Sequence, residues 1–166
     1  MRRLIAPVLG LILLVPAGCA GQTAGSGSGS ASDDGGDAVP AVTGNVTRPA
    51  CPLTAAQVAE IVGRELPDTG NCSFNNGVAM VTIVTASEFA GKTTFDGQRT
   101  YAEQTYRQVK KLDKGDMAYF AVKDTGAEAA VVTKAGSYTV NLSSFIGFDA
   151  TTYEQTMRKL LDTIVP

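Results

Sequence analysis

Three cysteines are the residues of this chain with the most evident chemistry, and the chain contains no histidine. A thiol can be acylated, oxidised to a disulfide, bound to a metal or used as a nucleophile. The lack of histidine excludes Ser-His-Asp and Cys-His catalysis and every metal site that needs an imidazole ligand. Carboxylates, lysines, serines and tyrosines remain, and no constellation of them in the sequence identifies a catalytic site.

Cys19 follows a segment with the layout of an export signal. Two arginines precede a mostly apolar run over residues 4–15, and two small residues stand directly before the cysteine. This order of charged, apolar and small residues is typical of a signal peptide. The apolar run is shorter than the roughly 20 residues that span a bilayer. We therefore expect residues 1–18 to be a lipoprotein signal peptide and Cys19 to be the lipidated residue.

The alternative is an ordinary secretory signal that is cut after Ala17. Bacterial lipoproteins usually carry leucine three residues before the cysteine, and this chain has Pro16 there. The number of cysteines favours lipidation, because an exported protein seldom keeps a free thiol and a bond between Cys51 and Cys72 leaves Cys19 alone. The expected location is the outer face of the cytoplasmic membrane, with secretion as the alternative.

Residues 20–47 have the composition of a disordered tether. They contain seven glycines, four serines and five alanines, and they lack aromatic residues, leucine and isoleucine. Such a segment cannot bury enough apolar surface to offset its conformational entropy. As a flexible coil it would span roughly 30 Å. We divide the mature chain into a lipidated tether over 19–47 and a single globular domain over 48–166.

The domain carries 12 basic and 13 acidic residues, so the basic surface that nucleic-acid binding needs is not expected. Residues 86–93 imitate a phosphate-binding loop, but Ala86 replaces its first glycine and we read 91–93 as a turn leading to a helix cap, so no nucleotide is expected. Asp113 and Asp116 fall short of the ligand density of a calcium loop. We expect neither a metal nor a cofactor.

Cys51 and Cys72 are 21 positions apart, whereas redox-active pairs usually have two intervening residues. We therefore expect a structural disulfide between them. Thr54 and Gln57 have the spacing of a capping box at the start of a helix, and Gly63 is a plausible end of that helix. Strands are expected over 71–74 and 78–85, joined by an Asn-Gly turn. The disulfide would thus tie the entry of the helix to the edge of the sheet.

The remainder of the domain is expected to add two helices and three strands. The apolar pattern predicts a helix over 95–109, strands over 117–122, 128–133 and 137–143, and a final helix that begins after Asp149. Short turns between consecutive strands indicate antiparallel pairing. The predicted fold class is α+β, with a mainly antiparallel sheet of about five or six strands packed by two or three helices.

These motifs together resemble a family of small actinobacterial lipoproteins that is known only as a domain of unknown function. The resemblance rests on ACPLT at 50–54, NCSF at 71–74 and GDMAYF at 115–120, and it covers roughly residues 50–166. Phe74 stands where the family often has tryptophan. The resemblance implies a cell-envelope lipoprotein with a structural disulfide, and it implies no known reaction.

The sequence thus predicts a membrane-tethered extracytoplasmic lipoprotein that is a non-catalytic binding or accessory module of the cell envelope. Its expected partners are the membrane, through the lipid, and an envelope protein or small ligand whose contact residues the sequence does not reveal. One alternative is a hydrolase or transferase with carboxylate or Ser–Lys chemistry, which requires such groups to converge in one cavity. The other is a small lipid carrier, which requires a large apolar cavity.

Overall fold

The computed structural model describes residues 46–146 and 148–166. Within these residues the domain is α+β, with one antiparallel sheet of seven strands and three helices, so the predicted fold class is confirmed and the sheet is slightly larger than expected. In chain order the elements are α1 (Ala55–Val62), β1 (Asp68–Gly70), β2 (Ser73–Asn75), β3 (Ala79–Ala86), α2 (Glu88–Thr105), β4 (Gln108–Lys111), β5 (Met117–Lys123), β6 (Gly126–Thr133), β7 (Gly136–Ser144) and α3 (Ala150–Ile164).

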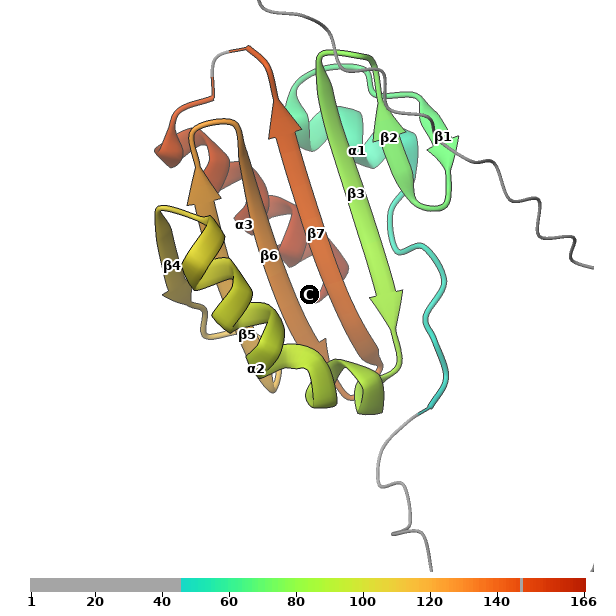
Figure 1. Ribbon diagram of the computed structural model, residues 1–166. Helices are drawn as coiled ribbons and strands as arrows, with labels where there is room; N and C mark the ends of the chain where they lie inside the picture. The colour runs from blue at the N-terminus through green and yellow to red at the C-terminus, as the bar shows by residue number, and fades with distance from the viewer. Residues whose placement is uncertain (1–45, 147) are drawn as a thin grey trace, which may run out of the picture. The chain divides into compact units, whose positions relative to one another are not determined.

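The strands lie in the order β1-β2-β3-β7-β6-β5-β4. The chain makes the β2–β3 hairpin, crosses the sheet through α2, and returns as a four-stranded meander from β4 to β7. The last strand of the meander pairs with β3 along its whole length, from Ala79 opposite Ser144 to Ala86 opposite Ser137. Helices α1 and α3 lie behind the sheet and α2 lies in front of it (Figure 1). The sheet therefore has two different faces.

The face toward α1 and α3 holds the main hydrophobic core. Alternate residues of β7 are buried there, as the strict alternation of the sequence predicts, and they pack against the apolar stripe of α3. The Thr54–Gln57 capping box begins α1, Gly63 ends it in the left-handed conformation, and the Asp149 carboxylate accepts a 2.7 Å hydrogen bond from the backbone amide of Thr152 at the start of α3. Local sequence signals thus predicted both ends of α1 and the start of α3 correctly.

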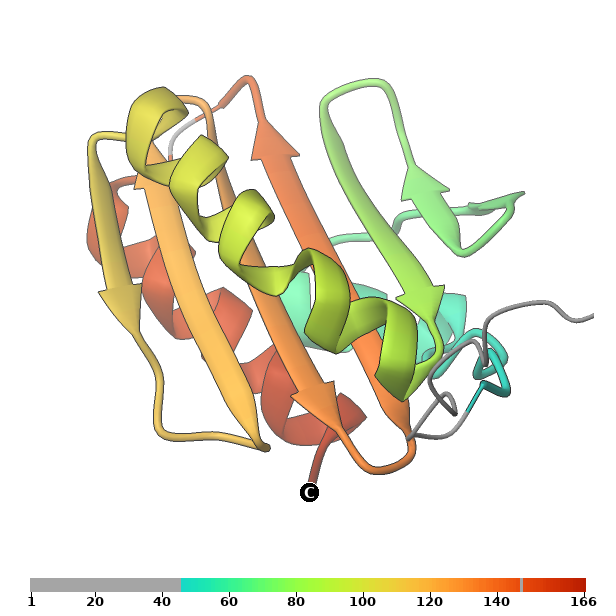
Figure 2. The ribbon, with the colours of Figure 1, turned by 60° about the horizontal axis from the view of Figure 1, so that its bottom comes forward.

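Helix α2 covers only part of the opposite face. It runs diagonally from the end of β3 toward β4 and β5 (Figure 2). Phe95 and Ala102 of α2 pack into a second, smaller apolar cluster, in which the rings of Phe95 and Tyr119 meet edge to face with centroids 5.5 Å apart. The upper parts of β2, β3 and β7 have no helix in front of them (Figure 1).

The predicted helix over 95–109 was wrong at both ends. Helix α2 begins seven residues earlier, after Ser87, whose hydroxyl accepts a hydrogen bond from the amide of Ala90, and residues 108–111 form strand β4. The apolar pattern misled because Tyr106 and Val109 also contact the smaller cluster. Residues of α2 and of the edge strand β4 that pack into the same cluster therefore gave one continuous apolar pattern.

Gly91 allows α2 to approach β7 closely. A β-carbon at this position would lie 2.3 Å from the β-carbon of Ser137, whereas one at Gly97 on the same helix would meet nothing within 4 Å. We expect Gly91→Ala to lower the free energy of unfolding by about 1–3 kcal/mol through overpacking. Gly97→Ala, the matched control, will raise it by up to about 1 kcal/mol, because alanine favours the helix. Urea unfolding measures both, and equal effects would contradict the close approach.

Candidate functional site

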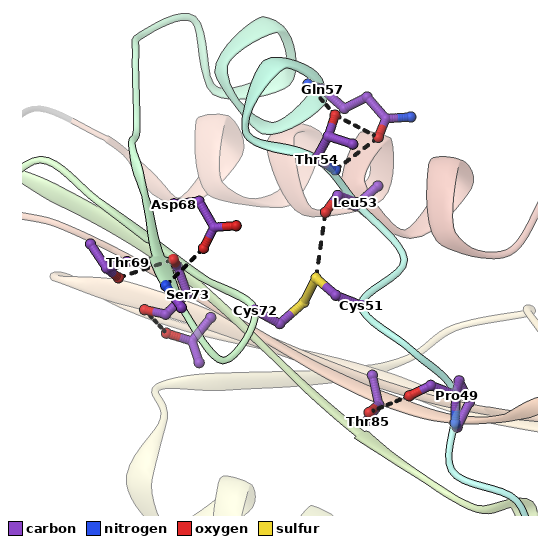
Figure 3. Close-up of a disulfide and its surroundings, with 12 residues drawn as sticks. Pro49, Cys51, Leu53, Thr54, Gln57, Asp68, Thr69, Cys72, Ser73 and Thr85 are labelled. Atoms are coloured by element: carbon purple, nitrogen blue, oxygen red, sulfur yellow. Dashed lines mark hydrogen bonds between the residues drawn. A yellow bond between two sulfur atoms is a disulfide. The ribbon is translucent and has the colours of Figure 1, made fainter.

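The predicted Cys51–Cys72 disulfide is present, with the two Cα atoms 5.5 Å apart. It joins the segment before α1 to the turn before β2 (Figure 3). The same N-terminal segment is held to β3 next to it, because the hydroxyl of Thr85 donates a 2.8 Å hydrogen bond to the carbonyl of Pro49. The disulfide therefore fastens the entry of the domain to the edge of its sheet.

Cys72 itself lies in a turn, not in the strand that was expected to contain it. Asn71 and Cys72 both have positive φ, 52° and 58°, after Gly70 at 92°. Residues other than glycine adopt this conformation at a cost. The short strand β1, which the sequence did not predict, precedes this turn and pairs with β2. The disulfide thus holds a tight and partly strained turn at the end of the sheet.

Cys19, the expected signal peptide and most of the expected tether lie outside the described residues. Lipidation therefore stays a prediction. None of the helices in the described part of the chain has the length and apolar character needed to cross a membrane.

Four charged side chains from three separate parts of the chain meet at the start of α2. The ammonium of Lys92 lies 2.6 Å from the buried Glu88 carboxylate and 3.3 Å from the carboxylate of Asp116. The ammonium of Lys134 lies 3.3 Å from each of the same two carboxylates. Two acids and two bases thus form a charge cluster between α2 and the loops that carry Asp116 and Lys134.

This charge cluster brings two carboxylates together beside a cavity of about 520 Å³ that Asp116 and Lys134 help to line. Hydrogen bonds from Lys92 and Lys134 hold the pKa of Asp116 below its usual value. Hydrogen bonds to Glu88 and Asp116 raise the pKa of Lys92. Both shifts keep the groups charged at neutral pH, whereas a general acid or base needs a pKa near the working pH. The arrangement is suited to holding α2 on the sheet.

The segment that imitates a phosphate-binding loop contributes residues to this charge cluster. Residues 91–93, expected as a turn, belong to the body of α2, because Ser87 caps the helix four positions earlier than Gly91. Lys92 of this segment is engaged with Glu88 and Asp116. Among the described residues, no three histidine, cysteine or acidic side chains gather in a way that would hold a metal ion.

The remaining candidate is the part of the sheet that α2 leaves uncovered, which we call the open face. Residues directly opposite each other in an antiparallel pair lie on the same side of the sheet. Register therefore places alternate residues of β2, β3 and β7 on this face, opposite to the main core. Its polar members are Ser73, Asn75, Thr82, Thr139, Asn141 and Ser143, and its apolar members are Met80, Val84 and Phe145.

A polar row crosses the middle of the open face. Ser73 on β2 lies opposite Thr82 on β3, Thr82 lies opposite Asn141 on β7, and Asn141 lies opposite Glu128 on β6. The hydroxyl oxygens of Ser73 and Thr82 are 3.5 Å apart. Neighbouring strands are about 4.8 Å apart, so the row presents hydroxyl and amide groups at regular intervals across the open face and ends at the Glu128 carboxylate on β6.

Much of the hydrogen-bonding capacity of the open face is not used within the domain. The side chains of Thr139, Asn141 and Ser143 are half-buried and make no hydrogen bond to any other described residue. Asn75 uses its carbonyl oxygen for the amide of Gly77, 2.7 Å away. Donors and acceptors with fixed positions and no partner in the fold are available to a ligand.

Met80 and Phe145 give one end of the open face an apolar border. The backbone amide of Phe145 donates to the carbonyl of Val78 at 3.0 Å, which continues the β7–β3 ladder by one residue and places Phe145 on the same side as Ser143. Its side chain is 83% exposed. With Asn75, Met80 and Ser143, Phe145 lines a cavity of about 260 Å³.

Glu128 is the charged residue at the border of the open face, and its carboxylate accepts a hydrogen bond from a tyrosine. The hydroxyl of Tyr119 donates a 2.5 Å hydrogen bond to the Glu128 carboxylate. Burial and the negative charge of Glu128 together raise the pKa of the nearby Tyr106 to about 12, and burial with the hydrogen bond to Glu128 raises the pKa of Tyr119 as well. Both tyrosines stay protonated in the folded domain at neutral pH.

These shifts predict an alkaline loss of stability. Tyrosines in the unfolded chain ionise near pH 10. Between about pH 10 and 12 the folded state therefore holds more protons than the unfolded state, so the stabilisation by these tyrosines, which is complete below about pH 10, falls as the pH rises. Tyr119→Phe should flatten this decline and should lower the free energy of unfolding at pH 7 by about 1.5–3 kcal/mol, because Glu128 loses its donor. Urea unfolding at pH 7 to 11 measures both. Tyr101→Phe, at an exposed ring, is the control, and an identical response of the two variants would contradict the assignment.

Comparison of the chain with protein-family models, with curated protein sequences and with solved structures found no significant match. The sequence missed the charge cluster, whose members lie up to 46 positions apart, and it did not identify the open face. The polar positions 139, 141 and 143 were the available signal for the open face.

Proposed function

We propose that this chain is a membrane-tethered extracytoplasmic lipoprotein, anchored through Cys19, and that its domain is a non-catalytic binding module of the cell envelope. The anchor is inferred from the signal-like order of residues 1–18 and from the cysteine count. The binding role is supported by one observation above all, the open face, where Thr139, Asn141 and Ser143 hold unused hydrogen-bonding groups in a rigid strand.

A sheet face is a suitable base for recognition because the ladder fixes the positions of its side chains. Strand β7 is paired on both sides, with β3 and with β6, so the backbone at Asn141 and Ser143 is fixed. Groups held in place lose little entropy when a ligand binds. The open face thus offers a preorganised pattern of donors and acceptors.

The catalytic alternative is less well supported than binding. Catalysis by carboxylates needs acids whose pKa is close to the working pH. Glu88 and Asp116 do converge, but each lies against two lysine ammonium groups, and the lowered pKa of Asp116 keeps its carboxylate ionised. No observation on the described residues favours the lipid carrier.

A photo-crosslinking experiment in intact cells tests the binding role. We would place p-benzoylphenylalanine at Val84, which is 51% exposed on the open face, and, in a matched control, at Thr163, which is exposed on α3. A binding module predicts a discrete adduct from position 84 that the control position does not give. Identical adduct patterns from the two positions, or no adduct from position 84, would contradict the proposal.

A further inference from the structure

The chemistry of the open face indicates which class of ligand it fits, and this step rests on the function proposed above. We propose that the open face binds an uncharged glycan chain that carries N-acetyl groups. Three properties of the face lead to this ligand: its charge, its hydrogen-bonding groups and the arrangement of its apolar side chains.

The open face has no ionisable side chain among its nine members. Glu128 is the nearest charge in the polar row, and its carboxylate already accepts the hydrogen bond from Tyr119. A nucleic acid or an anionic lipid surface requires basic side chains, and none lies on this face. Charge complementarity therefore points to a neutral ligand.

The polar groups match a ligand rich in hydroxyls and amides. Ser73, Thr82, Thr139 and Ser143 offer hydroxyls, each of which can donate and accept. Asn75 and Asn141 offer amide groups, which pair in both directions with the N–H and C=O of an acetamido group. Tryptophan, tyrosine and arginine, the residues most enriched at binding hot spots, do not occur on this face, and serine, which is depleted at protein–protein contacts, occurs twice; Phe145 and Met80 are the members of types that such contacts favour.

The apolar members are placed to contact the non-polar parts of the same ligand. Met80 is 38% exposed and lies directly opposite Ser143, and Phe145 follows at the end of β7. The cavity that these residues line with Asn75 is about 260 Å³. It brings an exposed ring and a thioether next to an amide, which suits the methyl of an N-acetyl group and the C–H face of a sugar ring.

The Phe145 end of the open face lies far from the point at which the described chain enters the domain. The described chain enters the domain at the end of β3, where Arg48 and Pro49 bind Thr85. Phe145 lies at the beginning of β3, beside Val78. Seven residue steps along the chain, from Val78 to Thr85, separate these two points, a length of about 23 Å. The Phe145 end of the open face is thus remote from the point at which the tether holds the domain.

A binding assay with the purified full-length chain in detergent tests this inference. The probe is fluorescein-labelled N-acetylchitohexaose, followed by fluorescence anisotropy, with labelled cellohexaose as the same backbone without N-acetyl groups. We expect the N-acetylated hexamer to bind and cellohexaose to bind at least tenfold more weakly. No binding of N-acetylchitohexaose at millimolar protein, or equal binding of cellohexaose, would overturn the inference.

Variants locate the binding on the open face. Thr82→Val/Asn141→Ala removes polar groups from the centre of the row, and Gln155→Ala/Thr163→Ala removes similar groups from the exposed side of α3. We expect at least a tenfold loss of affinity in the first variant only. If the double variant does not fold, Phe145→Ala takes its place. The Phe145 side chain is too exposed to contribute much to stability, and its loss should also weaken binding. Equal affinity of all variants would overturn the assignment to this face.

The two proposals can fail separately. If position 84 crosslinks to a protein in cells and N-acetylchitohexaose does not bind, the binding module stands and the glycan inference is overturned. If crosslinking is absent and the hexamer does not bind, both proposals are overturned. Binding of the Cys19→Ala variant, which lacks the proposed anchor, to vesicles of phosphatidylglycerol in place of the glycan would show that a lipid surface is the ligand and would likewise overturn the glycan inference.

Discussion

Replacement of both Cys51 and Cys72 by alanine is expected to lower the free energy of unfolding by about 3 kcal/mol, the value that the chain-entropy model gives for a loop of this size. The loss should reduce the melting temperature on the order of 10 °C in a domain of this length. The disulfide is the covalent link between the entry of α1 and the strained turn at Asn71 and Cys72, so its loss also frees that turn. Thermal unfolding followed by circular dichroism measures the effect.

Reduction of the unmodified chain provides the control. Reduced wild-type chain and the double alanine variant should melt at similar temperatures, because both lack the bond. In the oxidised wild type, an alkylating reagent should label neither cysteine until a reductant is added. Rapid labelling of both cysteines in the native domain, or an unchanged melting temperature in the double variant, would contradict a stabilising role of the bond.

Cys19→Ala is expected to remove the protein from the membrane fraction. Two or three acyl chains hold a protein stably on a bilayer, whereas a protein without them has only its surface contacts. The wild type should partition into the detergent phase, and its mature N-terminal peptide should carry the added mass of a diacylglyceryl group. Cell fractionation, detergent partition and mass spectrometry of that peptide measure the effect.

The cysteine double variant serves as the control for localisation. Cys51→Ala/Cys72→Ala should stay with the membrane, because the predicted anchor is independent of the disulfide. A mature N-terminus at an unmodified Gly18 would contradict lipidation and would make the protein a secreted one. In that outcome Pro16 is the residue to examine, because it stands where bacterial lipoproteins usually have leucine.

Elements with local signals were predictable from the sequence. The capping box at Thr54 and Gln57 needs only neighbouring residues, and Asp149 likewise caps α3 with its own side chain. The alternation of β7 identified its buried side. Helix α2 was less predictable, because glycines and threonines give it a weak helical signal and because Tyr106 and Val109 extend its apolar pattern into β4.

The candidate site depends on long-range placement, which one sequence does not reveal. Glu88 and Lys134 meet only because the turn between β6 and β7 reaches the start of α2. The polar positions of β7 were evident, but the same pattern fits a strand that is covered by solvent, by a helix or by a ligand. The diagonal path of α2 decides which part of the sheet stays open, and the lack of a β-carbon at Gly91 allows the helix to lie close to Ser137 along this path.

The central place of the β3–β7 pair has a consequence for how the chain acquires its structure. These two strands are separated in sequence by α2 and three further strands, so the middle of the sheet closes only when the last strand arrives. Such non-local pairing slows folding relative to helical domains. Until then, β3 and β6 both present unpaired edges, which favour aggregation. For a chain exported as we propose, the sheet must be completed outside the membrane, and a version truncated before β7 will not fold into a smaller stable domain.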